Sequence, residues 1–252
     1  MSYNSLTELF AATADAIRSK TGGTDPIVAN DFPDAIRSIS EGGGNEELVE
    51  SYKSVIERTA GNIVIPDSVT SIGDYAFYEC TNLALTSLPD GVTSLGHSAF
   101  YKCKNLSLTA LPDGVTSLDQ YTFYNCSNLA LSSLPDGVTR LPLLCFGYCK
   151  ALALTSLPDG LTEILDSAFA YCSALALTTL PASLTKIRKQ AFNLCTSLTE
   201  ITFQSTPSSI ASDAFRSCSN LTVINVPWAE GAVADAPWGA TNATINYNYT
   251  GE

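Results

Sequence analysis

The stretch "VTSLGHSAFYKCKNLSLTALPDG" at residues 92–114 is followed directly by "VTSLDQYTFYNCSNLALSSLPDG" at residues 115–137, and more than half of the positions match. The same 23-residue pattern runs through seven registers without an insertion. Each copy is marked by a phenylalanine and by a cysteine three residues later, at 77/80, 100/103, 123/126, 146/149, 169/172, 192/195 and 215/218. A constant period of this kind is typical of a solenoid, in which each unit stacks on the previous one.

The apolar positions within one period predict how a coil folds. They are spaced mostly by two to four residues, which favours short extended segments joined by bends over one long helix. "LPDG" predicts a corner because proline and Asp-Gly favour tight turns, and "HSAFYKC" predicts a short helical or 3₁₀ turn. We therefore expect a repeat solenoid of about seven 23-residue coils, mostly short β-strands, about 4.8 Å apart. The positions expected in its core are Leu83, Leu85, Leu88, Val92, Leu95, Phe100 and Cys103.

The cysteine ladder has two alternative explanations. Sulfurs stacked coil on coil could bind a soft metal or form disulfides, since the Cα spacing permits bridging. The seven in-register cysteines are odd in number and lie between phenylalanine and leucine in the apolar pattern. Because free cysteine behaves as a small hydrophobic side chain, the sequence favours buried reduced thiols and predicts no metal and no cofactor. One aspartate at each corner supplies too few oxygens per coil to bind calcium, so turn formation is the better explanation of these residues. The corner aspartates are Asp90, Asp113, Asp136 and Asp159.

Composition excludes several classes of function. The 252 residues carry a net charge of −12, and neither residues 1–60 nor residues 61–252 are basic, so nucleic acid is not an expected partner. His97 is the single histidine, and no catalytic or phosphate-binding motif is present, so we expect no enzymatic activity. The chain has no run of about 18 apolar residues and no signal peptide at its start, which predicts no membrane span and synthesis in the cytoplasm.

Three residues that follow the Ile or Leu at the start of each turn differ from one repeat to the next. They read "GDY" at 73–75, "GHS" at 96–98 and "DQY" at 119–121, and a second variable position follows each phenylalanine. We expect these variable side chains to face outward, either as a drifting solvated surface or as a binding strip. Exposed aromatic clusters favour recognition of partners or sugars. The candidate binding residues are Tyr75, Tyr78, His97, Tyr101, Tyr121 and Tyr124.

The two ends of the chain differ from the repeats. Residues 1–41 predict a small α-helical segment, and residues 42–60 predict a glycine hinge followed by a capping helix. The solenoid is expected over residues 61–228, followed by a C-terminal cap over 229–252, and Trp228 and Trp238 are expected to cover the last coil. The middle coils read "LALTSLP" and the last reads "LTVINVP", which indicates a different strand geometry at that end.

The motif I-G-x-x-A-F-x-x-C-x-x-L at 72–83 resembles the BspA-like leucine-rich repeats, and the resemblance covers about residues 62–228. It implies a solenoid used mainly for binding. The N-terminal "LTELFAATADAIRSKTGGTD" and the ending after residue 223 resemble tail-associated structural proteins of phages and prophages of Gram-positive gut bacteria. That second resemblance implies a virion tail or fibre component whose residues 1–41 dock to other tail proteins.

Two functions follow as expectations. The first is a non-enzymatic phage-tail protein whose solenoid recognises a host-surface protein or glycan. The alternative is a bacterial cell-surface or secreted adhesin of the BspA-like kind. The sequence leaves the oligomeric state open, including a homo-oligomer.

Overall fold

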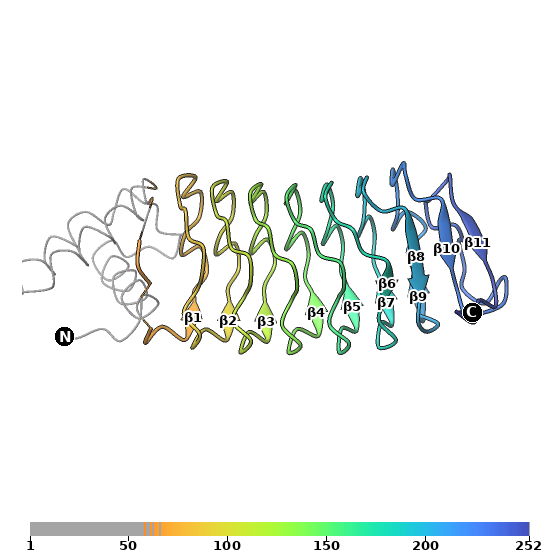
Figure 1. Cartoon of the computed structure of the whole chain (residues 1–252), viewed down its shortest axis with the longest axis horizontal. Coiled ribbons are helices and arrows are strands. Elements are labelled where there is room, and N and C mark those ends of the chain that lie inside the picture. The colour runs from red at the N-terminus through yellow and green to blue at the C-terminus, as the bar shows by residue number, and fades with distance from the viewer. Residues whose placement is uncertain (1–57, 59–60, 62, 66, 252) are drawn as a thin grey trace, which may run out of the picture.

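The computed structural model describes residues 58, 61, 63–65 and 67–251. This part of the chain forms a rod of stacked coils, with the coils following one another along the axis (Figure 1). Its described residues contain eleven short strands and no helix. The helical segment predicted for 1–41 and the hinge and capping helix predicted for 42–60 fall almost entirely outside the described residues.

Two rows of parallel strands run along the rod. In both, a strand pairs with its counterpart in the next coil, as Ser71 pairs with Ser94 and Ser94 with Ser117, so the 23-residue stacking predicted from the sequence is confirmed. The first row comprises β1 (Ser71–Ile72), β2 (Ser94–Leu95), β3 (Ser117–Leu118), β4 (Arg140–Leu141), β5 (Glu163–Ile164), β7 (Lys186–Ile187) and β9 (Ser209–Ile210). The second row comprises β6 (Thr179–Leu180), β8 (Glu200–Phe203), β10 (Val223–Asn225) and β11 (Thr244–Asn246).

The first row is interrupted between β3 and β4, and Pro142 explains the interruption. The residue after each strand donates its N–H to the preceding coil, as Asp119 does to the Leu95 carbonyl at 3.1 Å and Leu165 does to the Leu141 carbonyl at 2.9 Å. Pro142 occupies this position in the fourth coil and has no N–H to donate. The strands therefore form one sheet of three and another of four, although the coils stay in register.

The second row exists only toward the C-terminal end, as the change from "LALTSLP" to "LTVINVP" indicated. The segment at 200–203 reads Glu-Ile-Thr-Phe, with alternating buried and less buried side chains. This alternation suits a strand with one face on the core. In the coil before it, only Thr179–Leu180 form a strand, which pairs with Thr202 and Phe203. The corresponding segments of the earlier coils, at 85–88, 108–111, 131–134 and 154–157, form no strand in the described chain.

Stacked phenylalanines form the centre of the core. From Phe77 to Phe215 each ring packs on its counterpart in the next coil, with centroids 5.0–5.7 Å apart and planes within 18° of parallel. The seven positions predicted to be buried around one coil are all buried. Each ring is covered by the coils on both sides, so a single coil removed from the stack would expose its core.

The cysteines are buried free thiols, as predicted, and they also donate hydrogen bonds. The Cys126 thiol lies 2.9 Å from the carbonyl oxygen of Phe100, and the same contact at 2.9–3.0 Å recurs from Cys103 to Cys218. An aliphatic side chain of similar size would fill the space but could not donate to that buried carbonyl. Cysteine therefore meets two requirements of this position.

The turn at 73–80 is not helical, which corrects the expectation of a helical or 3₁₀ turn. Its N–H groups alternate between two directions: Phe77 donates to the Ala99 carbonyl of the next coil at 2.7 Å, whereas Tyr78 donates back to Tyr75 at 3.0 Å. Tyr75 and Glu79 adopt φ of 57° and 58°. Non-glycine residues do so at the first position in the coils from 98 to 190 and at the second position in the coils from 102 to 217. These left-handed residues redirect every second N–H toward the neighbouring coil, which a helix does not allow.

The "LPDG" corners are β-turns, as their sequence predicted. The N–H of Val92 donates to the carbonyl of Pro89 at 3.0 Å, and equivalent bonds close the turns at 112–115, 135–138 and 158–161. The four corner aspartates are exposed.

An eighth, modified coil follows Phe215 and includes part of the segment for which a C-terminal cap was predicted, 229–252. Trp238 lies 23 residues after Phe215, is fully buried, and accepts a hydrogen bond from the Phe215 N–H at 2.9 Å. β11 then pairs in parallel with β10. Trp228 and Trp238 cover the last coils as expected, because both contact Phe203, at 5.2 Å and 6.0 Å between ring centroids.

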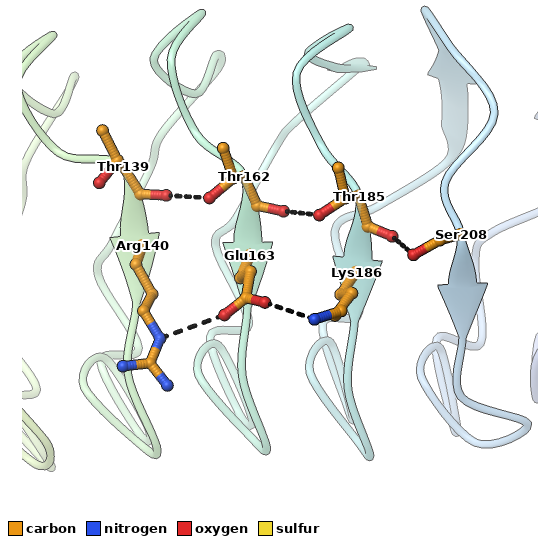
Figure 2. A network of polar contacts seen from close by, with 7 residues as sticks. All are labelled: Thr139, Arg140, Thr162, Glu163, Thr185, Lys186 and Ser208. Carbon is orange, nitrogen blue, oxygen red and sulfur yellow. Dashed lines mark hydrogen bonds and ion pairs between the residues drawn. The ribbon is translucent and has the colours of Figure 1, made fainter.

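Polar side chains form ladders along the exposed side of the first strand row (Figure 2). The hydroxyls of Thr162, Thr185 and Ser208 donate to the carbonyl one coil earlier at 2.9–3.0 Å. Beside them Glu163 lies between two cations, 3.3 Å from Arg140 and 2.9 Å from Lys186. Hydrogen bonding to Lys186 and the nearby positive charges lower the pKa of Glu163.

Thiol reactivity tests the cysteine ladder. Burial raises the pKa of the Cys80 and Cys218 thiols to about 12 and raises that of the thiols between them well above the ordinary value. Because the thiolate is the reactive form, we expect none of the eight cysteines to react quickly with a disulfide reagent at pH 8 in the folded protein. All eight should react after denaturation. Fast labelling of an interior thiol such as Cys149 without unfolding would contradict the buried ladder.

Replacing Glu163 with Gln tests the charged ladder. The lowered pKa means that Glu163 stabilises the fold above its unfolded value near 4.5, and that this contribution is lost as the pH falls through the folded value. We expect E163Q to lower the free energy of unfolding by about 0.5–1 kcal/mol at pH 7, because exposed ion pairs contribute little each. The difference from the wild-type protein should disappear near pH 3 in chemical denaturation. The exposed Glu230 supplies the control, since E230Q removes the same charge without an ion pair to a described residue.

Candidate functional site

The residues after each first-row strand form one continuous face of the rod, which we call the turn face. It consists of 73–81 in the first coil and of the segments displaced by multiples of 23, up to 211–219, with Arg58 preceding them at the same spacing. All six aromatic residues proposed from the sequence lie here. Their ring contacts join them into one cluster.

The inner row of this cluster is a stack of tyrosines. Tyr78 packs on Tyr101 with centroids 4.7 Å apart, and Tyr101 packs on Tyr124 at 4.9 Å, with planes within 13° of parallel. All three are half-buried. The ring faces are therefore covered by neighbouring rings.

The inner row continues beyond the three tyrosines predicted from the sequence. Tyr124 meets Tyr148 edge to face at 5.4 Å, and Tyr148 stacks on Tyr171 at 4.1 Å. The step from Tyr124 to Tyr148 is 24 residues, so a strict 23-residue spacing misses it. Gly147 takes the in-register position, and a Cβ there would lie 3.2 Å from the Tyr124 ring. The inner row thus spans five coils: Tyr78, Tyr101, Tyr124, Tyr148 and Tyr171.

The outer row comes from the three variable letters. Tyr75 is 55% exposed and contacts His97 at 5.1 Å, and His97 contacts Tyr121 at 5.8 Å, both in edge-to-face geometry. Tyr75 and Tyr121 also touch the inner row, at 5.7 Å from Tyr78 and 5.9 Å from Tyr124. Tyr75 and Tyr121 are two of the left-handed turn residues.

The expectation that all variable letters face outward is wrong in part. Ser98 is 3% exposed, and Pro142 is also buried. In the second variable position the last coils carry side chains that are small or that fit between coils, and three of these are buried: Gly147, Ala170 and Asn193. Variation among repeats therefore marks both the surface and the places where adjacent coils adjust to one another.

The inner and outer rows together form what we call the aromatic strip. Charged side chains border this strip at its N-terminal end. Glu79 lies between Arg58 at 2.6 Å and Lys102 at 2.9 Å. Hydrogen bonding to Glu79 raises the pKa of Lys102. Arg58 lies over the Tyr78 ring and Lys102 over the Tyr101 ring, at 5.4 Å and 5.1 Å from the centroids, which is within the range of cation–π attraction.

The described residues hold no group of three His, Cys, Asp or Glu side chains that could bind a metal ion. They also contain no helix with the length and hydrophobicity needed to cross a bilayer. The turn face exposes the ring edges and hydroxyls of its tyrosines along a backbone held by the stacked coils. Such a surface is suited to recognition of another molecule.

A family model described as "BspA type Leucine rich repeat region (6 copies)" matches residues 56–176 and 144–230. The chain is a BspA-type leucine-rich repeat protein. No match is found among the curated protein sequences.

Solved structures of bacterial leucine-rich repeat proteins share the solenoid. A leucine-rich cell surface protein from Faecalibacterium prausnitzii is 29% identical, with a TM-score of 0.52, over 66% of this chain and 55% of that chain. The leucine-rich repeat protein TpLRR of T. pallidum is 28% identical, with a TM-score of 0.56, over 63% of this chain and 77% of that one. A protein from Eubacterium ventriosum is 27% identical, with a TM-score of 0.54, over 66% and 45%. This BspA-type chain thus spans about half the length of the first of these relatives.

The contact between Tyr148 and Tyr171 can be tested by titration. Hydrogen bonding with Tyr171, together with burial, raises the pKa of Tyr148 above its ordinary value near 10. We expect Y171F to lower the pKa of Tyr148, measured by NMR on ring-labelled tyrosine. An unchanged Tyr148 pKa would show that the two phenol hydroxyls do not interact.

Proposed function

We propose that this BspA-type protein is a non-enzymatic binding module that acts at a cell surface, and that it recognises its ligand through the aromatic strip. The observation that carries this proposal is the joined cluster of inner and outer rows on one face of the rod. Aromatic side chains provide large contact areas with little loss of conformational entropy, and tyrosine is common among the residues that dominate binding energy.

The surface location rests on the family and on the Faecalibacterium prausnitzii relative, which is described as a cell surface protein. The same evidence favours the surface-protein alternative of the sequence analysis over the phage-tail reading. The latter depends on residues 1–41, which lie outside the described part of the chain, and on the ending of the chain. A virion tail role therefore stays a prediction of those terminal resemblances.

Cell binding tests the proposal. Fluorescent protein is titrated onto cultured epithelial cells and onto Gram-positive gut bacteria, and saturable binding is measured by flow cytometry. The triple variant Tyr75→Ala, His97→Ala, Tyr121→Ala removes the outer row, and we expect it to weaken binding about tenfold or more. Binding to bacteria alone would favour the hypothesis that the protein is a phage-tail component.

A control variant removes side chains from another side of the rod. Thr86, Thr109 and Ser132 are exposed and lie in the segment before the corner. Their triple alanine variant should bind as the wild-type protein does. Equal loss in both variants, or no binding by the wild-type protein to either cell type, would refute the aromatic strip as the site.

A further inference from the structure

The turn face carries a charge opposite in sign to the rest of the molecule. The whole chain has a net charge of −12, yet most of the cations in the described part lie on this one face. The turn-face cations are Arg58, Lys102, Lys104, Lys150, Arg188, Lys189 and Arg216, and the turn-face acids are Asp74, Glu79, Asp119, Asp166 and Asp213. The other faces of the described rod hold nine acids and only two cations, Arg140 and Lys186.

The acids of the turn face are engaged within the protein. Asp74 accepts the His97 N–H at 2.7 Å, and Asp166 accepts the Lys189 N–H at 3.2 Å. Asp119 accepts the N–H of Gln120 at 2.6 Å, and Asp213 accepts the side-chain amide of Gln190 at 3.2 Å. Glu79 is held between its two cations. Each acid thus has at least one oxygen engaged by another residue, within the same turn for Asp119 and in an adjacent coil for the other four.

Five of the cations are in the opposite situation. They are exposed and form no ion pair with a described carboxylate; they are Lys104, Lys150, Arg188, Lys189 and Arg216. On the strand side, by contrast, Arg140 and Lys186 are both paired with Glu163 (Figure 2). The free positive charge of the described rod is therefore concentrated on the face that also carries the tyrosines.

The geometry of the rings narrows the kind of partner. The inner-row tyrosines cover one another's faces, so these rings offer little free ring face for stacking on a sugar ring. Hydroxyls and ring edges remain, beside the half-buried side chains of Leu143 and Leu165 at the middle of the turn face. Such a mixed surface suits the amide groups and apolar side chains of a polypeptide.

We propose, on the basis of the proposed function, that the ligand of the turn face is an acidic, extended polypeptide segment that lies along the rod. Its apolar side chains and backbone amides contact the tyrosine rows, and its carboxylates meet the unpaired cations at the edge of the strip and in the last coils. Because a rim of exposed charge acts chiefly on association, binding weakens as salt is added.

A matched pair of double variants tests this proposal. R188Q with K189Q removes one arginine and one lysine from the turn face, and R140Q with K186Q removes the same charges from the strand side. The probe is a fluorescent random copolymer of glutamate and tyrosine, with alginate as an anionic polysaccharide and polylysine as a cationic polymer. Dissociation constants are measured by fluorescence anisotropy at several salt concentrations.

We expect the wild-type protein to bind the copolymer more tightly than alginate and not to bind polylysine. The turn-face double variant should weaken copolymer binding about tenfold, and the strand-side variant should change it less than about twofold. K104Q with K150Q, at the other edge of the strip, should also weaken binding. Thermal unfolding of each variant confirms that the fold is retained.

The outcomes also separate this inference from the proposed function. Equal effects of the two double variants, tighter binding of alginate, or no binding of the copolymer would overturn the acidic polypeptide segment as ligand. Loss of cell binding in the outer-row triple variant would still support the aromatic strip in that event. If the strip variants leave both cell and copolymer binding intact, the turn face is not the site and both proposals fail.

Discussion

Each coil of this protein is completed only by its neighbours, and the rest of the structure depends on that constraint. The carbonyl of Phe100 accepts a hydrogen bond from the thiol of the next coil, and the rings from Phe100 to Phe192 are covered on both sides by equivalent rings. Every second N–H in the turn donates to the following coil. A residue that fails any of these roles disturbs two coils at once. This explains why the phenylalanine, cysteine and leucine positions repeat so strictly while nearby letters change.

The same constraint creates the candidate site. Left-handed residues in each turn redirect the backbone toward the adjacent coil, and two of them, Tyr75 and Tyr121, carry the outer aromatic row. Side chains at equivalent positions are held at the spacing of the coils, so tyrosines in successive coils stack without further support. The ridge is rigid for the reason that the core is rigid, and a ligand would meet a surface that needs little reorganisation.

Much of the fold could be predicted from the sequence because a constant repeat length determines which residues stack on one another. The spacing of Phe77, Cys80 and their repeats fixes the stacking and the core, and "LPDG" fixes the corner. The turn between them could not be assigned from composition, because the alternation of N–H partners depends on the next coil.

The interruption at Pro142 and the eighth coil could both have been predicted from the sequence. Proline lacks the needed N–H donor, and Trp238 keeps the 23-residue interval from Phe215. The cysteine after it is replaced by Thr241, which hid that coil. In the site, the sequence pattern did not predict Tyr148 and Tyr171 as members of the inner row. Gly147 occupies the position in the 23-residue register, and the row shifts by one residue, which only the packing shows.

The repetition of the coils has a consequence for the length of the rod. Because each strand pairs with its counterpart 23 residues later, inserting or deleting one whole 23-residue unit would preserve the parallel register. Buried side chains that differ between coils, such as Ser98 and Pro142, restrict which units can stack on one another. Where these side chains match, the tyrosine ridge would lengthen or shorten by whole coils without a change of fold.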